Sequence, residues 1–315
     1  MFDLMNPIKL KIDFDIVKKE FPFLWPSFFN MGSCFAENQS LKFNDFGFSI
    51  NSNPFGIFYN PISIELILRR ILTEKFYTPN DFLSLDGYFS LEHHGSYSYD
   101  TLNNAIEESN LILTKTKNHL KRIEVCVITL GSSLVYKHEN KIVANCHRLP
   151  TQDFEQVQLT HQQVLNSIAS ITDCFKSLNK NIHIVFTVSP VRHLRSGVIE
   201  NSRSKAILIS ALHDFIESKE SINTSYFPAY EIFMDELRDY RFSKEDFVHP
   251  TKQAQDYIWD RFCDTYFSGD TKTIISSVEK YLNYKNHRPS KIELYQKQLN
   301  YMKQQLLKTY PFLKL

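Results

Sequence analysis

Two runs of apolar residues, rich in β-branched side chains, constrain the fold of this chain most strongly. They are residues 123–130 (IEVCVITL) and residues 183–188 (HIVFTV). Neither run alternates regularly between polar and apolar positions, which is typical of strands buried on both faces of a parallel sheet. Between them, apolar residues recur at helical spacing at Val164, Ile168, Ile171 and Phe175. Strands and helices that alternate in this way predict an α/β fold.

Further elements of the same kind precede and follow these runs. Short strands at residues 27–31, 48–50 and 226–227 complete a mostly parallel sheet of about five strands with helices on both faces. Ligands of such sheets bind beyond the carboxyl ends of the strands, so the turns after the strands are where chemistry is expected. The expected helices cover residues 34–45, 101–120, 203–217 and 252–267, with another that begins at Pro61.

Three segments fall outside this alternation. Residues 80–100 predict a hairpin or a long loop, and residues 134–144 predict a hairpin. Residues 290–308 predict an amphipathic helix that docks on the domain, with a homodimer through this helix as the alternative. We expect one domain over residues 1–270 and a C-terminal helical extension over residues 271–315.

Charge and cysteine content exclude several classes of protein. The 36 Lys and Arg residues balance the 35 Asp and Glu residues, so no strong positive field attracts nucleic acid or an anionic membrane. There is no run of about 18 apolar residues and no secretion signal, so we expect a cytoplasmic protein. The five cysteines are scattered without a CxxC pair, which predicts reduced thiols and neither a metal nor a cofactor site.

The turn after the first expected strand carries two candidate nucleophiles, Ser33 and Cys34. Cys34 stands at the expected start of a helix, where free N–H groups and the helix dipole stabilise a thiolate. Ser33 could attack with the help of an adjacent base. The sequence does not decide between them, and small residues in such a turn also serve tight packing.

A candidate base and its partner occur in the segment DFVHP at residues 246–250. In a loop, this spacing lets the Asp246 carboxylate bind one nitrogen of His249, while the other nitrogen faces a nucleophile. The alternative is that Asp246 caps a turn and His249 is an exposed loop histidine. Combined with the turn at Ser33 and Cys34, the pair predicts nucleophilic catalysis.

The segment NMGSCFAEN at residues 30–38 resembles the signature of the GSCFA family. That family is similar to the SGNH or GDSL-type hydrolases, which implies a flavodoxin-like, three-layer αβα fold. In their pattern Cys34 takes the nucleophile position, and Asp246 and His249 match the last motif. Further motifs follow in the order of the GSCFA family: NPFG at 53–56, TLGS at 129–132, NCH at 145–147, SPVRH at 189–193 and DELRDYRF at 235–242.

The resemblance also implies where an oxyanion would be held. Gly56 matches a glycine whose N–H donates to the oxyanion, and Asn53 begins the same turn. Ser133, or Ser132 in a shifted register, stands where the pattern has an Asn, so this donor is shorter.

Arg192 and His193 follow the fourth expected strand and should line the same crevice. Arg192 could bind a carboxylate or phosphate of the substrate, or pair with an acid at the surface.

The resemblance implies an esterase that acts on an acylated carbohydrate or another small ester. Because thiolates attack and leave readily, an O-acyltransferase with a Cys34 thioester intermediate is an alternative. A further alternative is an inactive module that binds a glycan or a protein in the same crevice.

Overall fold

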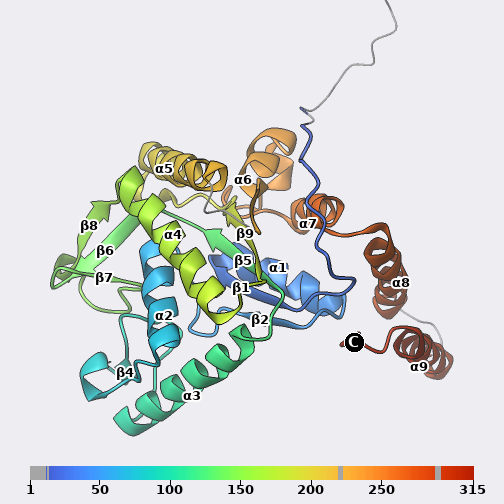
Figure 1. Ribbon diagram of the computed structural model, residues 1–315, viewed down its shortest axis with the longest axis horizontal. Coiled ribbons are helices and arrows are strands. Elements are labelled where there is room, and N and C mark those ends of the chain that lie inside the picture. Colours follow the sequence, from blue (N-terminus) through green and yellow to red (C-terminus); the bar gives the residue numbers. More distant parts are fainter. Residues whose placement is uncertain (1–11, 13, 219–222, 288–291) are drawn as a thin grey trace, which may run out of the picture.

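A five-stranded parallel sheet forms the centre of the molecule (Figure 1). The computed structural model describes residues 12, 14–218, 223–287 and 292–315. The strand order is β10-β9-β5-β1-β2, and neighbouring strands run parallel. Read from β2, this is the flavodoxin-like order, so the predicted α/β fold is confirmed. The strands are β1 (Phe28–Gly32), β2 (Ile50–Ser52), β5 (Val125–Leu130), β9 (His183–Val188) and β10 (Thr224–Phe227).

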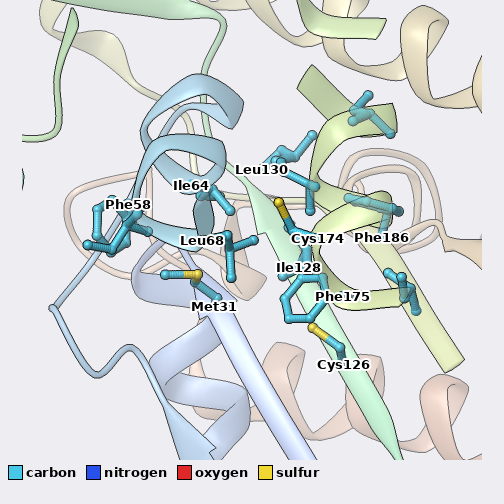
Figure 2. Packing of buried hydrophobic residues seen from close by; sticks show 14 of the residues in the cluster. Met31, Phe58, Ile64, Leu68, Cys126, Ile128, Leu130, Cys174, Phe175 and Phe186 are labelled. Atoms are coloured by element: carbon cyan, nitrogen blue, oxygen red, sulfur yellow. The ribbon is translucent and has the colours of Figure 1, made fainter. Parts of the chain in front are cut away.

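Helices cover both faces of this sheet because its strands are apolar on both sides. Met31 and Ile128 point into a core shared with α2, α3, α4 and α5 (Figure 2). Phe28 and Val125 belong to a second core, shared with α1, α7 and α8. The result is a three-layer sandwich. The helices are α1 (Cys34–Asp45), α2 (Pro61–Thr73), α3 (Leu102–Leu120), α4 (His161–Leu178), α5 (Val198–Glu217), α6 (Ala229–Glu231), α7 (Lys252–Tyr266), α8 (Gly269–Lys285) and α9 (Ile292–Thr309).

Two small antiparallel sheets are inserted between these elements. β3 (Leu83–Ser84) and β4 (Tyr88–Phe89) form a hairpin within residues 80–100. β6 (Leu134–His138) and β7 (Lys141–Val143) form the second expected hairpin. β8 (Glu155–Gln158) pairs with β6, which the sequence analysis did not predict. Short 3-10 turns lie at Pro79–Asp81, Thr151–Asp153, Leu194–Ser196 and Tyr240–Phe242, and a π-helical turn at Ile232–Glu236.

Two predicted boundaries were wrong by a few residues. β2 begins at Ile50 and not at Phe48, because the Phe48 N–H donates back to the Phe43 carbonyl oxygen in α1. α5 begins at Val198, ahead of the expected Arg203. Val198 and Ile199 are exposed, so the first turn of α5 shows no apolar period in the sequence.

The C-terminal tail returns to the domain. α9 packs on α8, and the Lys314 N–H then donates to the Gly47 carbonyl oxygen at 2.9 Å. Leu313 is buried in the second core. The expected tail helix therefore docks on its own chain; residues 290 and 291, like residues 1–11 and 13, lie outside the described part. Across the described ranges, no helix combines the length and the apolar character needed to cross a membrane.

Candidate active site

The turn after β1 is fixed by both neighbouring strands of the sheet. Gly32 has a φ of +136°, and a Cβ there would lie 2.1 Å from the carbonyl oxygen of Thr129, so no side chain fits. The Ser33 N–H donates to that same oxygen at 3.2 Å. The Gly32 N–H donates to Asn53 Oδ1 at 2.8 Å, just beyond β2. The position of the following residue, Cys34, is therefore set by β5 and by the end of β2.

Cys34, His249 and Asp246 form one chain of contacts. Cys34 Sγ lies 3.9 Å from His249 Nε2, and His249 Nδ1 lies 2.7 Å from Asp246 Oδ2. The other Asp246 oxygen accepts the N–H groups of Val248 and His249, both at 2.9 Å. These donors, with the imidazole, hold the pKa of Asp246 well below its usual value. An ionised Asp246 retains the proton on Nδ1 and leaves the Nε2 lone pair facing the sulfur.

The surroundings of the Cys34 thiol favour its protonated form. The side chain is half-buried, and burial raises the pKa of the thiol, with the charge of Glu37 adding to the rise. The N–H groups of Phe35 and of Cys34 itself lower the pKa, as does the charge of Lys205. The thiolate stabilisation expected at the start of α1 is thus outweighed by burial, and the thiol needs a base to remove its proton.

The Ser33 side chain caps the start of α1. Its hydroxyl is buried and accepts the Phe35 N–H at 3.3 Å, as the N-cap of α1. The residue that meets the imidazole of His249 is Cys34. Of the two candidates that the sequence leaves open, the geometry therefore favours Cys34 as the nucleophile.

A model of the GSCFA family matches residues 27–262. The chain belongs to the GSCFA family. The matched segment begins just before β1 and ends within α7, so it contains the central sheet and the Cys34, Asp246 and His249 constellation. A comparison with curated proteins finds no match.

In this GSCFA protein, the expected oxyanion donors have other partners. The Gly56 N–H donates to the Asn53 carbonyl oxygen at 2.7 Å. The Ser133 hydroxyl donates to the Ser204 carbonyl oxygen at 3.0 Å and accepts Gln158 Nε2. The side-chain donor implied at Ser133 is therefore engaged in joining β6, β8 and α5.

The Ser132 hydroxyl also has hydrogen-bond partners, whereas the side-chain amide donor of Asn53 has none among the described residues. Ser132 Oγ accepts the Leu134 N–H at 2.9 Å and contacts Ser204 Oγ. Asn53 Nδ2 is buried, and no acceptor contacts it within the described residues. Asn53 therefore keeps a free amide donor while its oxygen holds the Gly32 N–H.

Arg192 and His193 leave β9 in different directions. Arg192 forms no ion pair within the described residues; Nη2 lies 3.6 Å from Met234 Sδ. It lines a cavity of about 530 Å³ with Tyr230 and Tyr240. His193 packs edge-on against Tyr59, with ring centroids 5.0 Å apart. Burial, together with the charges of Lys205 and His249, lowers the pKa of His193 to about 4, so the ring is neutral.

Lys205 is a residue that the sequence analysis missed. Its side chain is 1% exposed, and Nζ donates to the carbonyl oxygens of Gly131 and Ser189, both at 2.7 Å. Burial lowers the pKa of Lys205 to about 7, and the Cys34 charge opposes this. A signal was present: Lys205 shares the apolar stripe of α5 with Leu208, Leu212 and Phe215.

A cavity of about 290 Å³ lies beside His193, and its lining combines apolar side chains with polar ones such as Asn60, Gln156 and Arg195. Tyr59 and side chains of β6 and β7 line it, among them Leu134, Val135 and Val143. Over the described ranges, no cluster of three or more His, Cys, Asp or Glu side chains could hold a metal ion.

Proposed function

We propose that this protein is an SGNH-like acyl-group hydrolase that forms a thioester on Cys34. One observation carries the proposal: Cys34 Sγ, His249 and Asp246 are aligned at 3.9 Å and 2.7 Å at the carboxyl end of the sheet. A thiol at a helix start, a neutral imidazole and an ionised carboxylate are the parts needed for nucleophilic acyl transfer.

The reaction follows from these positions. His249 Nε2 accepts the thiol proton, and the sulfur attacks the carbonyl carbon of the ester. A C–S bond forms and the carbonyl oxygen becomes an oxyanion. When the C–O bond to the leaving alcohol breaks, the imidazolium returns the proton to that alcohol. Water, deprotonated by His249, then attacks the thioester; the carboxylic acid leaves and the thiol is restored.

The oxyanion donors differ from the implied set. The N–H of Cys34 itself, at the start of α1, is a candidate donor to the oxyanion, because the following N–H groups of Phe35 and Ala36 already donate to Ser33. The unpaired Asn53 Nδ2 lies in the turn joined to Gly32. We propose that Asn53 supplies the side-chain amide whose counterpart in the SGNH pattern is replaced by Ser133.

The cavity beside His193 suits a short acyl group. It has a volume of about 290 Å³ and is lined by Tyr59 and by residues of β6 and β7. The apolar part of this lining, at Leu134, Val135 and Val143, favours burial of methylene groups. We therefore propose a small ester or an acylated carbohydrate as the substrate.

Acyl transfer to an alcohol is a second candidate, favoured by the partial burial of Cys34. A half-buried thioester meets less water than an exposed one, so a bound hydroxyl group can compete as the acceptor. Added glycerol distinguishes the two: a transferase releases acyl-glycerol faster than acid, whereas a hydrolase releases acid in both conditions.

The test uses p-nitrophenyl acetate and iodoacetamide on the wild type, Cys34→Ala, His249→Ala and the control Cys146→Ala. Cys146 is also a half-buried thiol whose pKa is raised by burial. We expect Cys34→Ala and His249→Ala to lose at least about 10² in turnover, while Cys146→Ala keeps it. Turnover at the uncatalysed rate in the wild type would overturn the proposal in favour of the binding module. Unchanged turnover in Cys34→Ala would overturn the thioester on Cys34 and leave Ser33 as the candidate nucleophile.

A further inference from the structure

Lys205 is a buried lysine whose hydrogen bonds to two carbonyl groups provide no negative charge to balance an ammonium group. An ammonium group is costly to bury without a counter-ion, and no carboxylate in the described part of the chain pairs with Lys205. An apolar side chain would fill the same position on α5 among Leu208 and Leu212 at lower cost. We therefore expect the positive charge of the side chain to be the reason for a lysine at this position.

The Lys205 ammonium is held at the edge of the sheet where the proposed reaction occurs. Its two acceptors, Gly131 and Ser189, directly follow β5 and β9. β5 pairs with β1, whose end carries Cys34. A lysine has three N–H donors, so the two carbonyl groups leave one donor without an acceptor in the described residues.

The groups that face Lys205 identify its counter-charge. From α6, the Tyr230 ring lies 5.7 Å from Nζ, and burial raises the pKa of that tyrosine, so it stays neutral. From the turn after β9, His193 is a neutral imidazole. From α1, Cys34 lies two residues beyond Gly32, which pairs with Thr129 of β5, and Gly131, an acceptor of Lys205, lies two residues beyond Thr129. This places Cys34 and the Lys205 acceptor at neighbouring strand ends, and the charges of the two groups affect the pKa of each other. Cys34 is the one member of this set that becomes an anion during the proposed reaction.

We propose that Lys205 is the counter-charge of the Cys34 anion: a positioning residue whose ammonium group stabilises the thiolate while His249 holds the proton. The inference rests on the proposed function for the reaction it serves. When the proton moves from sulfur to His249 Nε2, the thiolate gains an imidazolium as its neighbour, and the ammonium group of Lys205 adds a second positive charge at the same edge of the sheet. No bond to Lys205 forms or breaks.

The first test is the pH profile of Cys34 alkylation by iodoacetamide, read by peptide mass spectrometry. Lys205→Met removes the charge at similar volume, and Lys205→Arg keeps it. The control Lys117→Met removes a partly buried lysine that donates to the Leu72 carbonyl oxygen. We expect Lys205→Met to slow alkylation about tenfold at pH 6.5 and to move the profile to higher pH. Lys205→Arg should restore part of the rate, and Lys117→Met should match the wild type.

A second measurement needs no variant, in case Lys205→Met does not fold. Iodoacetate places a permanent carboxylate on Cys34, and iodoacetamide places a neutral amide of the same size there. In protein labelled with ¹³C-lysine, the Lys205 resonance should titrate at higher pH in the carboxymethyl form than in the amide form. Equal midpoints, or a Lys205→Met alkylation profile that overlays the wild type, would overturn the inference. Neither readout requires ester turnover, so a titration shift without turnover removes the proposed function and leaves this inference standing.

Discussion

The variant Ser33→Ala tests which of the two candidate residues is the nucleophile. In the structure the Ser33 side chain caps α1, whereas the Cys34 side chain contacts His249. The buried Ser33 hydroxyl accepts the Phe35 N–H at 3.3 Å, so the variant loses the cap of α1 and leaves that N–H unpaired. We expect a loss of about 1–2 kcal/mol in unfolding free energy. Cys34 Sγ and His249 keep their contact, so turnover should stay within a factor of a few.

The stability effect is small but measurable. For a chain of 315 residues, it lowers the melting temperature by about 2 °C. Urea unfolding gives the free energy, and p-nitrophenyl acetate gives turnover on the same preparations. Ser202→Ala is the control, because the Ser202 hydroxyl donates to the Val198 carbonyl oxygen on the exposed side of α5 and should change stability by less than about 0.5 kcal/mol.

Two results would refute this reasoning. If Ser33→Ala abolishes turnover while Cys34 still reacts with iodoacetamide, Ser33 is the nucleophile and its place in the cap is incidental. If Ser33→Ala unfolds at the same urea concentration as the wild type, the hydrogen bond to Phe35 does not stabilise α1.

Two further predictions concern charge. Asp246→Asn places an amide beside His249 Nδ1 and releases the tautomer that aims Nε2 at the sulfur, so turnover should fall about 10²–10⁴-fold with the fold intact by circular dichroism; unchanged turnover would contradict the role of Asp246. Burial lowers the pKa of His93 to about 3, below its unfolded value near 6.5, so the unfolded state binds the proton and stability falls as pH drops through this window. Between pH 7 and 4.5, the wild type should lose about 3 kcal/mol more unfolding free energy than His93→Phe; parallel losses in urea titrations would contradict this.

The sheet was predictable because its signal is local. The runs at 123–130 and 183–188 are apolar throughout, and each forms a central strand with both faces covered. β8 was not predictable in the same way: its residues EQVQ are mostly polar, and it exists because β6 offers a free edge. Edge pairing of this kind depends on the partner strand and not on the residues of β8 themselves.

Some features of the candidate site could likewise be predicted from the local sequence, and others could not. The spacing of Asp246 and His249 leaves a hydrogen bond and a turn cap as alternatives, and the hydrogen bond is expected because a candidate nucleophile occurs elsewhere in the chain. In the structure Asp246 makes both contacts, because both residues lie in one short loop. The role implied for Ser133 does not follow from its motif, because Ser204 and Gln158 reach it from α5 and β8. The role proposed for Lys205 could not be predicted from the sequence, because it depends on which face of α5 covers the ends of the strands. The sequence of α5 alone does not show this.

The contact between Cys34 and His249 joins residues 215 positions apart. The thiol therefore leaves the ribosome long before the imidazole does. Until then Cys34 lacks the base that the proposed mechanism requires. If the proposed function holds, Cys34 can attack an ester only after the loop before α7 has docked beside the completed sheet. Catalytic competence would then be one of the last properties that the folding chain acquires.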